Sequence, residues 1–175
     1  SHKALTSQIR FLSPLKISGY QARQTITGKN IEAHINQFYG DRFERQRINF
    51  EVTEAFRSLK ISDLPSRIYP VFINLINNAM YWVSLVESRK IKIDLIDDLV
   101  VIANSGPRVD EDDIQRLFDL FYTKRANGRG VGLYLCRENL AVAHHKIWYA
   151  EQLNDDPFIF EEGANFIIKF NGLEK

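Results

Sequence analysis

This 175-residue chain has little cysteine, no excess of one charge sign and no long apolar run, and each of these absences excludes a class of protein. Cys136 is the single cysteine, so an internal disulfide is excluded and a reducing compartment is expected. Neither charge sign dominates: 23 lysines and arginines balance 22 acidic residues, which gives no global signal for a nucleic-acid or membrane partner. No apolar run approaches the roughly 20 residues of a membrane-spanning helix, and no signal peptide is recognisable. We therefore expect a cytoplasmic protein.

The composition is that of an ordinary globular chain. Apolar residues make up 45% and charged residues 26%, and the length suffices for one buried core. Repeats, low-complexity tracts and obvious linkers are not visible. We expect a helical N-terminal segment over residues 1–45 and the main domain over 46–175.

Hydrophobic periodicity predicts the elements of secondary structure. Ile31, Ile35 and Phe38 recur at helical spacing and predict a helix over about 29–39. Residues 46–61 alternate and predict extended chain, and a long helix is expected over about 70–88 because Pro70 suits a first helical turn. The remaining predictions are strands over 90–96 and 99–103, helices over 110–117 and 131–145, and strands over 146–150 and 165–170. This order predicts an α/β two-layer sandwich with a mixed or antiparallel sheet.

Three glycines alternate directly before the helix predicted from residue 131. Gly128, Gly130 and Gly132 allow close approach of a ligand to the main chain. A helix start presents unpaired N–H groups and the positive end of the helix dipole, so the segment suits a phosphate. On these residues alone, a glycine-rich turn before an ordinary helix is an equal alternative.

Asparagines cluster in the long predicted helix. Asn74 and Asn78 share one face, Trp82 continues the row, and Asn77 lies beside them. Such a row of amide oxygens suits Mg²⁺, which takes hard oxygen ligands together with water and phosphate. Asparagines that bond neighbouring loops or face water are the alternative. The turn that begins at Asn104 is, on its own, a common turn composition.

Taken together and in order, these segments resemble the Bergerat-fold (GHKL) ATPases, which include histidine kinases, gyrase-type topoisomerases, heat-shock chaperones and mismatch-repair ATPases. The resemblance covers about residues 66–171 and is closest to the catalytic ATP-binding domain of sensor histidine kinases. The four matching boxes are the N box FINLINNAM (72–80), the first glycine box VIANSGPRV (101–109), the F box LFDLFYTK (117–124) and the second glycine box GRGVGL (128–133). The resemblance implies a mixed, mostly antiparallel sheet covered on one face by helices.

The resemblance also implies roles for individual residues in binding Mg-ATP. Asn78 would coordinate Mg²⁺, and Asn74 would help to bind metal or phosphate. Trp82 falls where an aromatic ring covers the adenine, and Asn104 where an aspartate reads the adenine amino group. The other implied nucleotide contacts come from the first glycine box and a lid over 118–129 that leads into the second: Gly106, Arg108, Thr123, Lys124, Gly128, Arg129, Gly130, Val131, Gly132 and Leu133.

Three positions depart from the family pattern. Asn104 replaces an aspartate and loses the charge-assisted part of the adenine contact. Arg108 replaces a glycine, and it either crowds the nucleotide or contacts a phosphate. Asn74 stands where hydrolysing members carry a glutamate, and because an amide cannot act as a general base, efficient hydrolysis is disfavoured.

The histidines give no clear phosphoacceptor. His34 lacks the acidic neighbour and the proline of that motif, so a surface or packed role is expected. His144 and His145 end a predicted helix, where we expect them to cap it. Cys136 is expected in the core.

The preferred hypothesis is a histidine-kinase-like phosphotransferase, in which Lys124 and Arg129 stabilise the transferred group. Residues 1–45 would then end a dimerisation hairpin of a homodimer, and the phosphate would pass to a histidine domain and a response-regulator pathway. Two alternatives stay open. One is an ATP-gated switch of the gyrase, chaperone or mismatch-repair type, and the other is a degenerate nucleotide-binding interaction module, which Asn104 and Arg108 would explain.

Overall fold

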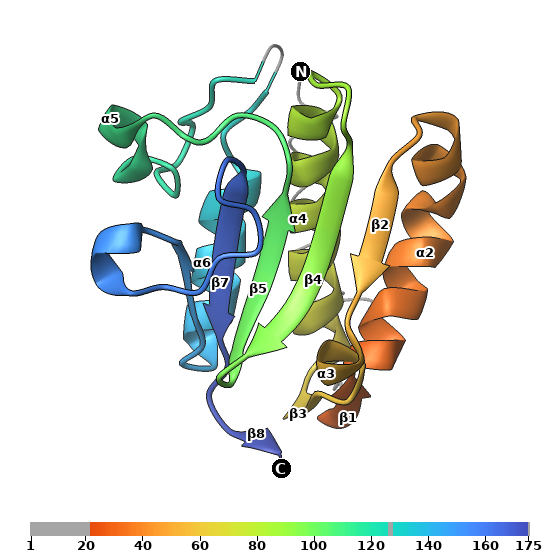
Figure 1. The fold of residues 1–175 in the computed structure, drawn as a ribbon. Coiled ribbons are helices and arrows are strands. Elements are labelled where there is room, and N and C mark those ends of the chain that lie inside the picture. Colours follow the sequence, from red (N-terminus) through yellow and green to blue (C-terminus); the bar gives the residue numbers. More distant parts are fainter. Residues whose placement is uncertain (1–21, 126–127, 175) are drawn as a thin grey trace.

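A five-stranded sheet carries helices on one face (Figure 1). The structure, a computed structural model, describes residues 22–125 and 128–174. In spatial order the strands are β2 (Asn49–Val52), β4 (Lys90–Ile96), β5 (Leu99–Asn104), β7 (Ala164–Lys169) and β6 (Lys146–Tyr149). The β2–β4 pair is parallel and the other pairs are antiparallel, which confirms the mixed, mostly antiparallel sheet.

A second, small sheet was not predicted. It consists of β1 (Gln24–Thr27), β3 (Lys60–Asp63) and β8 (Leu173–Glu174), with β3 in the centre and both pairs antiparallel. Strands of two to four residues are too short to show a two-residue period, so only their pairing defines them.

The first described helix, α2 (Gly28–Arg45), is longer than predicted. Thr27 and Asn30 form a capping box at its start. Its buried stripe runs Ile31, Ile35, Tyr39 and Phe43, whereas Phe38, which was predicted to face the core, is 45% exposed. The helix packs against the long helix α4 (Pro65–Val83) in one shared core, so the two sides of the expected boundary at residue 45 are joined by packing. Residues 1–21 of the expected N-terminal segment lie outside the described residues.

The start of α4 corrects the prediction for residues 70–88. Pro65 occupies the first helical turn, and Pro70 lies inside the helix, where its missing N–H removes one early hydrogen bond. The helix ends at Val83, because the chain turns at Ser84 through Val86.

The segment predicted to be extended over 46–61 contains a short helix, α3 (Glu54–Arg57), between β2 and β3. The Thr53 side chain accepts the Phe56 N–H at 3.2 Å and caps this helix, which buries the Phe56 ring completely. Thr53 followed by Glu54 is typical of a helix start, but the alternating pattern around it led to the prediction of extended chain.

The C-terminal half follows the prediction closely. Strands β4 and β5 join through Asp97 and Asp98, whose φ angles of 51° and 63° suit a tight hairpin. The helices α5 (Glu111–Ile114) and α6 (Gly132–Val142) are shorter than predicted, and His144 with φ 61° ends the helical chain. Cys136 is fully buried, as expected.

The face of the sheet opposite the helices is covered in part by the β6–β7 connection, which includes the 3-10 turn η1 (Gln152–Asn154). Phe158, Ile159 and Phe160 of this connection pack on the second cluster of buried residues, which includes Val101 and Ile167. None of the helices in the described ranges is long and apolar enough to cross a membrane.

Candidate functional site

A cleft in two parts lies between α4, the segment that follows β5, and the chain leading into α6. The first part has a volume of about 240 Å³ and the second about 140 Å³. The two parts share six lining residues, so they form one continuous site: Asn78, Leu117, Tyr122, Thr123, Arg125 and Leu133.

The first part is lined mainly by apolar side chains. Trp82 comes from the last turn of α4, Val109 and Leu117 flank α5, and Phe166 comes from β7. A concave apolar surface that includes an aromatic ring suits a flat aromatic group such as a nucleobase. This part is where the prediction for Trp82 places the adenine.

The second part is polar and glycine-rich. It is lined by Asn74, Asn77 and Asn78 on one side and by the predicted phosphate segment on the other: Gly128, Arg129, Gly130, Val131, Gly132 and Leu133. The structure thus brings the asparagine row and the second glycine box to the same cavity, as the sequence predicts.

Asn74 and Gly132 face each other across the polar part of the cleft. The Asn74 side chain donates to the Pro70 carbonyl at 2.9 Å, and its amide oxygen faces Gly132, where an added Cβ atom would lie only 3.2 Å away. Gly132 therefore keeps space between the amide oxygen and the start of α6.

The start of α6 lacks a capping side chain among the described residues, and its first turn holds no acidic residue, two features that it shares with α4. Its first N–H groups lie beside the polar part of the cleft, which Val131 and Gly132 line.

Two of the glycines are required by the backbone. Gly130 has φ 67°, and an added Cβ would lie 2.3 Å from the carbonyl carbon of Phe121, whose N–H donates to the Gly130 carbonyl at 2.7 Å. A Cβ on Gly128 would lie 2.5 Å from the Thr123 hydroxyl oxygen. These contacts fold the lid segment back on itself.

Two residues of the first glycine box lie outside the cleft, and Arg108 lines only its apolar part. Asn104 is 2% exposed and does not line the cleft, because its amide donates to the Ser105 carbonyl at 2.7 Å. Gly106 has φ 115° and packs against the Trp82 carbonyl, outside the cleft. Arg108 lines the apolar part, with its guanidinium 5.9 Å from the Phe158 ring, and does not reach the polar part.

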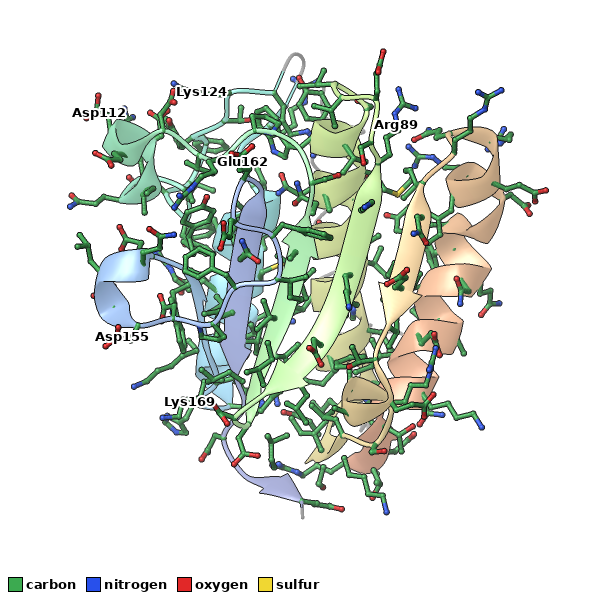
Figure 2. All side chains as sticks on the ribbon, in the orientation of Figure 1. Arg89, Asp112, Lys124, Asp155, Glu162 and Lys169 are labelled. Atoms are coloured by element: carbon green, nitrogen blue, oxygen red, sulfur yellow. The ribbon has the colours of Figure 1, made fainter. Side chains whose placement is uncertain are left out.

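Lys124 lines the apolar part of the cleft and forms ion pairs with two acidic residues. Its ammonium is 2.5 Å from the Asp113 carboxylate and 3.6 Å from that of Asp110. The hydrogen bond between them raises the pKa of Lys124 and lowers the pKa of Asp113. Figure 2 shows Lys124 at the corner of the molecule that also carries Asp112 of α5.

Sequence reasoning did not single out Asn77, Tyr122 or Arg125 as lining residues. Arg125 contacts both parts of the cleft, and its guanidinium lies 4.6 Å from the centre of the Tyr81 ring. Burial lowers the pKa of Arg125. In the sequence, the feature that could have indicated Arg125 as a lining residue is that it directly follows the basic residue Lys124.

The side chains that line the polar part of the cleft could bind a metal ion mainly through the amide oxygens of asparagines. Among the described residues, no group of three histidines, cysteines, aspartates or glutamates is placed to hold a metal ion. The oxygens of Asn74 and Asn78 are of the hard type that Mg²⁺ accepts together with phosphate and water.

The histidines lie outside the cleft. His34 stacks on Tyr69 with a centroid distance of 4.4 Å, which agrees with a packed histidine. His145 does not cap α6, and this corrects the prediction. It is 4% exposed and lies at 2.7 Å from the Asp63 carboxylate, which is completely buried.

Comparison with known proteins agrees with this geometry. Residues 63–172, more than half of the chain, match the family described as histidine kinase-, DNA gyrase B- and HSP90-like ATPases. The chain belongs to this family of ATPases. The match begins at Asp63 in β3 and ends between β7 and β8, so it contains every residue that lines the cleft.

Individual relatives are sensor proteins. The chain is 31% identical over 90 residues to the sensor histidine kinase TmoS of Ectopseudomonas mendocina, which covers 47% of this chain and 9% of that protein. It is 31% identical over 121 residues to the sensor protein ChvG of Rhizobium meliloti, covering 63% of this chain and 20% of that protein. The chain therefore spans a fifth or less of these two relatives.

Solved structures share the fold. The catalytic domain of histidine kinase ThkA superposes with a TM-score of 0.65 at 24% identity, over 83% of this chain and 93% of that domain. A crystal structure of ThkA in complex with the response regulator TrrA matches with a TM-score of 0.64 at 24% identity, over 83% of this chain and 40% of that one.

Proposed function

We propose that the chain binds Mg-ATP and, as a histidine-kinase-like catalytic domain, transfers the γ-phosphate to a histidine in a dimerisation domain or a partner. The adenine would occupy the apolar part of the cleft beside Trp82, and the phosphates would occupy the part lined by glycines. Membership of the ATPase family supports the choice of nucleotide. By analogy with the ThkA complex, a response regulator would receive the phosphate next.

One observation carries the proposal, namely the meeting of the asparagine row with the uncapped start of α6. The Asn74 amide oxygen faces Gly132 across a polar cavity, and Asn78 lines both parts of the cleft. A helix start attracts a phosphate, but an amide oxygen repels one unless a cation lies between them. The donor set therefore fits Mg²⁺ held by Asn78 and Asn74 beside a phosphate chain.

A bound Mg²⁺ would supply neutralisation of the phosphate charge and polarisation of the phosphate oxygens. The chain's own residues would orient the nucleotide: the helix start binds phosphate oxygens, Gly130 and Gly132 leave room for them, and Trp82 fixes the base. Lys124 would have to leave Asp113 to stabilise the transferred group, whereas Arg129 is exposed at the polar part.

The transfer itself needs no base from this chain. A lone pair on the acceptor imidazole forms the P–N bond while the bond from the γ-phosphorus to the bridging oxygen breaks, and ADP keeps those electrons. The acceptor ring then loses its other N–H proton to solvent. Catalysis would rest on positioning and electrostatics. Asn74 cannot activate water, so hydrolysis should be slow.

Titration calorimetry of Mg-ATP into the pure protein tests the proposal. We expect saturable binding to the wild type and an affinity roughly tenfold lower or worse for Asn78→Ala, because a metal ligand is lost. Asn36→Ala is the matched control, since Asn36 is an exposed asparagine of α2 that lines neither part of the cleft. A wild type that binds no Mg-ATP would refute the proposal.

Phosphate transfer from radiolabelled ATP to a separately supplied dimerisation domain that carries an acceptor histidine tests the kinase step. Labelled histidine in that domain, absent with Asn78→Ala, is the expected result. Dimerisation of the domain on adding a non-hydrolysable ATP analogue, without any transfer, would instead favour the ATP-gated switch.

A further inference from the structure

We propose that Arg125 is the lid cation that contacts the phosphates of the bound nucleotide and sets the preference for a triphosphate over a monophosphate. This inference rests on the proposed nucleotide binding and assigns a role to a residue that the four sequence boxes leave out.

The position of Arg125 is unlike that of the other cations of the lid. It lines both parts of the cleft, and it also lines a groove of about 300 Å³ between α2 and α4 that holds Arg42 and Arg89. The Arg125 side chain therefore borders the polar part of the cleft on one side and a cationic surface on the other.

The charge of Arg125 has no acidic partner. No ion pair joins it to a carboxylate anywhere in residues 22–125 and 128–174. Its guanidinium packs over the Tyr81 ring, and its Nε atom is buried without a hydrogen-bond partner in the described part of the chain. Burial of this kind disfavours the charged form, which is why the pKa of Arg125 is lowered.

Such an arrangement is costly without an anion. The side chain of Arg125 is half-buried, and a buried Nε–H without a hydrogen-bond partner costs free energy that a cation–π contact offsets only in part. An incoming phosphate would supply both the missing charge and the missing acceptors. The planar fork of a guanidinium matches two phosphate oxygens at once, which a point-like ammonium does not.

The other two lid cations fit this role less well. Lys124 lines only the apolar part and is held by Asp113 and Asp110, so a phosphate contact would first require these ion pairs to break. Arg129 is exposed and lines only the polar part, so water already solvates its charge. Arg125 is the one among these three that combines burial, contact with both parts and the lack of a carboxylate partner.

The test compares ATP with AMP, both as Mg²⁺ complexes, by calorimetry on wild type, Arg125→Ala, Arg125→Lys, Lys124→Ala and the matched control Arg45→Ala. Arg45 is an exposed arginine of α2 that lines neither part of the cleft, so its variant should bind both nucleotides as the wild type does. We expect Arg125→Ala to weaken ATP binding roughly 10- to 100-fold, the range for a lost charge-assisted hydrogen bond, and to change AMP binding less than threefold. Arg125→Lys should recover part of the ATP affinity. Lys124→Ala should weaken ATP binding less than Arg125→Ala does.

The outcomes separate this inference from the proposed function. If the wild type binds ATP and Arg125→Ala binds it equally well, the inference is overturned and the proposed function stands. Equal losses for ATP and AMP would show a structural role for Arg125 and would also overturn it. A wild type that binds neither nucleotide would overturn the proposed function and this inference together. Thermal melting of each variant confirms that it is folded.

Discussion

Replacing His145 with leucine should destabilise the protein and change its response to acid. His145 lies in the turn between α6 and β6 and bridges two other parts of the chain. Its Nε2 atom lies 2.7 Å from the carboxylate of Asp63 at the end of β3, and its Nδ1 atom accepts the Asn171 N–H at 2.9 Å. Because Nδ1 is an acceptor, the proton resides on Nε2 and the ring is neutral.

The expected loss follows from the groups left without partners. Leucine cannot bond to the N–H of the exposed residue Asn171 or to the buried carboxylate of Asp63, and the loss of a partner by a buried group costs about 1–3 kcal/mol. Asp63 keeps the Leu64 N–H at 2.7 Å and the Arg67 guanidinium, so its charge is not isolated. We expect a loss of about 3 kcal/mol in the free energy of unfolding, which corresponds to roughly 6–12 °C in Tm for a chain of this size.

The same geometry fixes the sign of the pH dependence. Burial lowers the pKa of His145 below 6.5 in the folded state, so the unfolded chain takes up the proton first as pH falls. The stability due to the neutral ring is fully present above pH 6.5 and is lost progressively below it. His34 also has a lowered pKa through burial, but it contributes equally to wild type and variant and cancels in their difference.

Urea denaturation followed by circular dichroism at pH 7.5 and pH 5.5 measures both effects. Wild-type stability should fall by up to about 1.4 kcal/mol for each pH unit in the range where the proton is taken up, and the His145→Leu variant should lack that part of the slope. His144→Asn is the control, since His144 is exposed and asparagine tolerates its φ of 61°. An unchanged free energy of unfolding, or the same pH slope in the variant, would refute the reasoning.

Three further results are expected. Gly130→Ala should weaken Mg-ATP binding at least tenfold in calorimetry, because φ 67° and the 2.3 Å contact with Phe121 force the lid to rearrange, whereas Gly40→Ala in α2 meets nothing within 4 Å and should bind normally. The Cys136 thiol, fully buried with its pKa raised by burial, should not react with a disulfide reagent at pH 8 until the protein is unfolded. Asn74→Glu should increase phosphate release from ATP roughly 100-fold or more by supplying a general base, and no increase would count against the orientation proposed for ATP.

Long periodic segments were predictable from the sequence because one physical signal dominates each of them. Strand β4 alternates, β5 is a continuous apolar run, and a turn of two aspartates joins them. The cleft-lining face of α4 follows from the four-residue spacing of Asn74 and Asn78. The ordered boxes then placed the glycines of the lid opposite the asparagines, which the structure brings to one cavity.

The missed features depend on contacts between residues distant in the sequence. The burial of His145 requires Asp63, 82 positions earlier, so a local reading could only suggest a helix cap. The withdrawal of Asn104 from the cleft depends on its bond to the next carbonyl, which competes with any ligand. Arg125 resembles its neighbour Lys124 in the sequence, and the two differ only in their tertiary contacts: Asp113 lies beside Lys124, whereas Arg125 packs on Tyr81 and lines both parts of the cleft.

The small sheet has a consequence for how the chain can be connected. Thr27 of β1 and Glu174 of β8 both lie opposite Lys60 of β3, so two places 147 positions apart are separated by two strand spacings, about 10 Å. In Figure 1 this sheet lies at the bottom and the lid at the top. In a chain trimmed to residues 24–174, a linker of about six to ten residues would bridge β8 to β1. A circular permutant opened at the exposed Asp97–Asp98 hairpin should therefore keep its nucleotide cleft unchanged, since the integrity of that site depends on the core and not on the order in which its elements are joined.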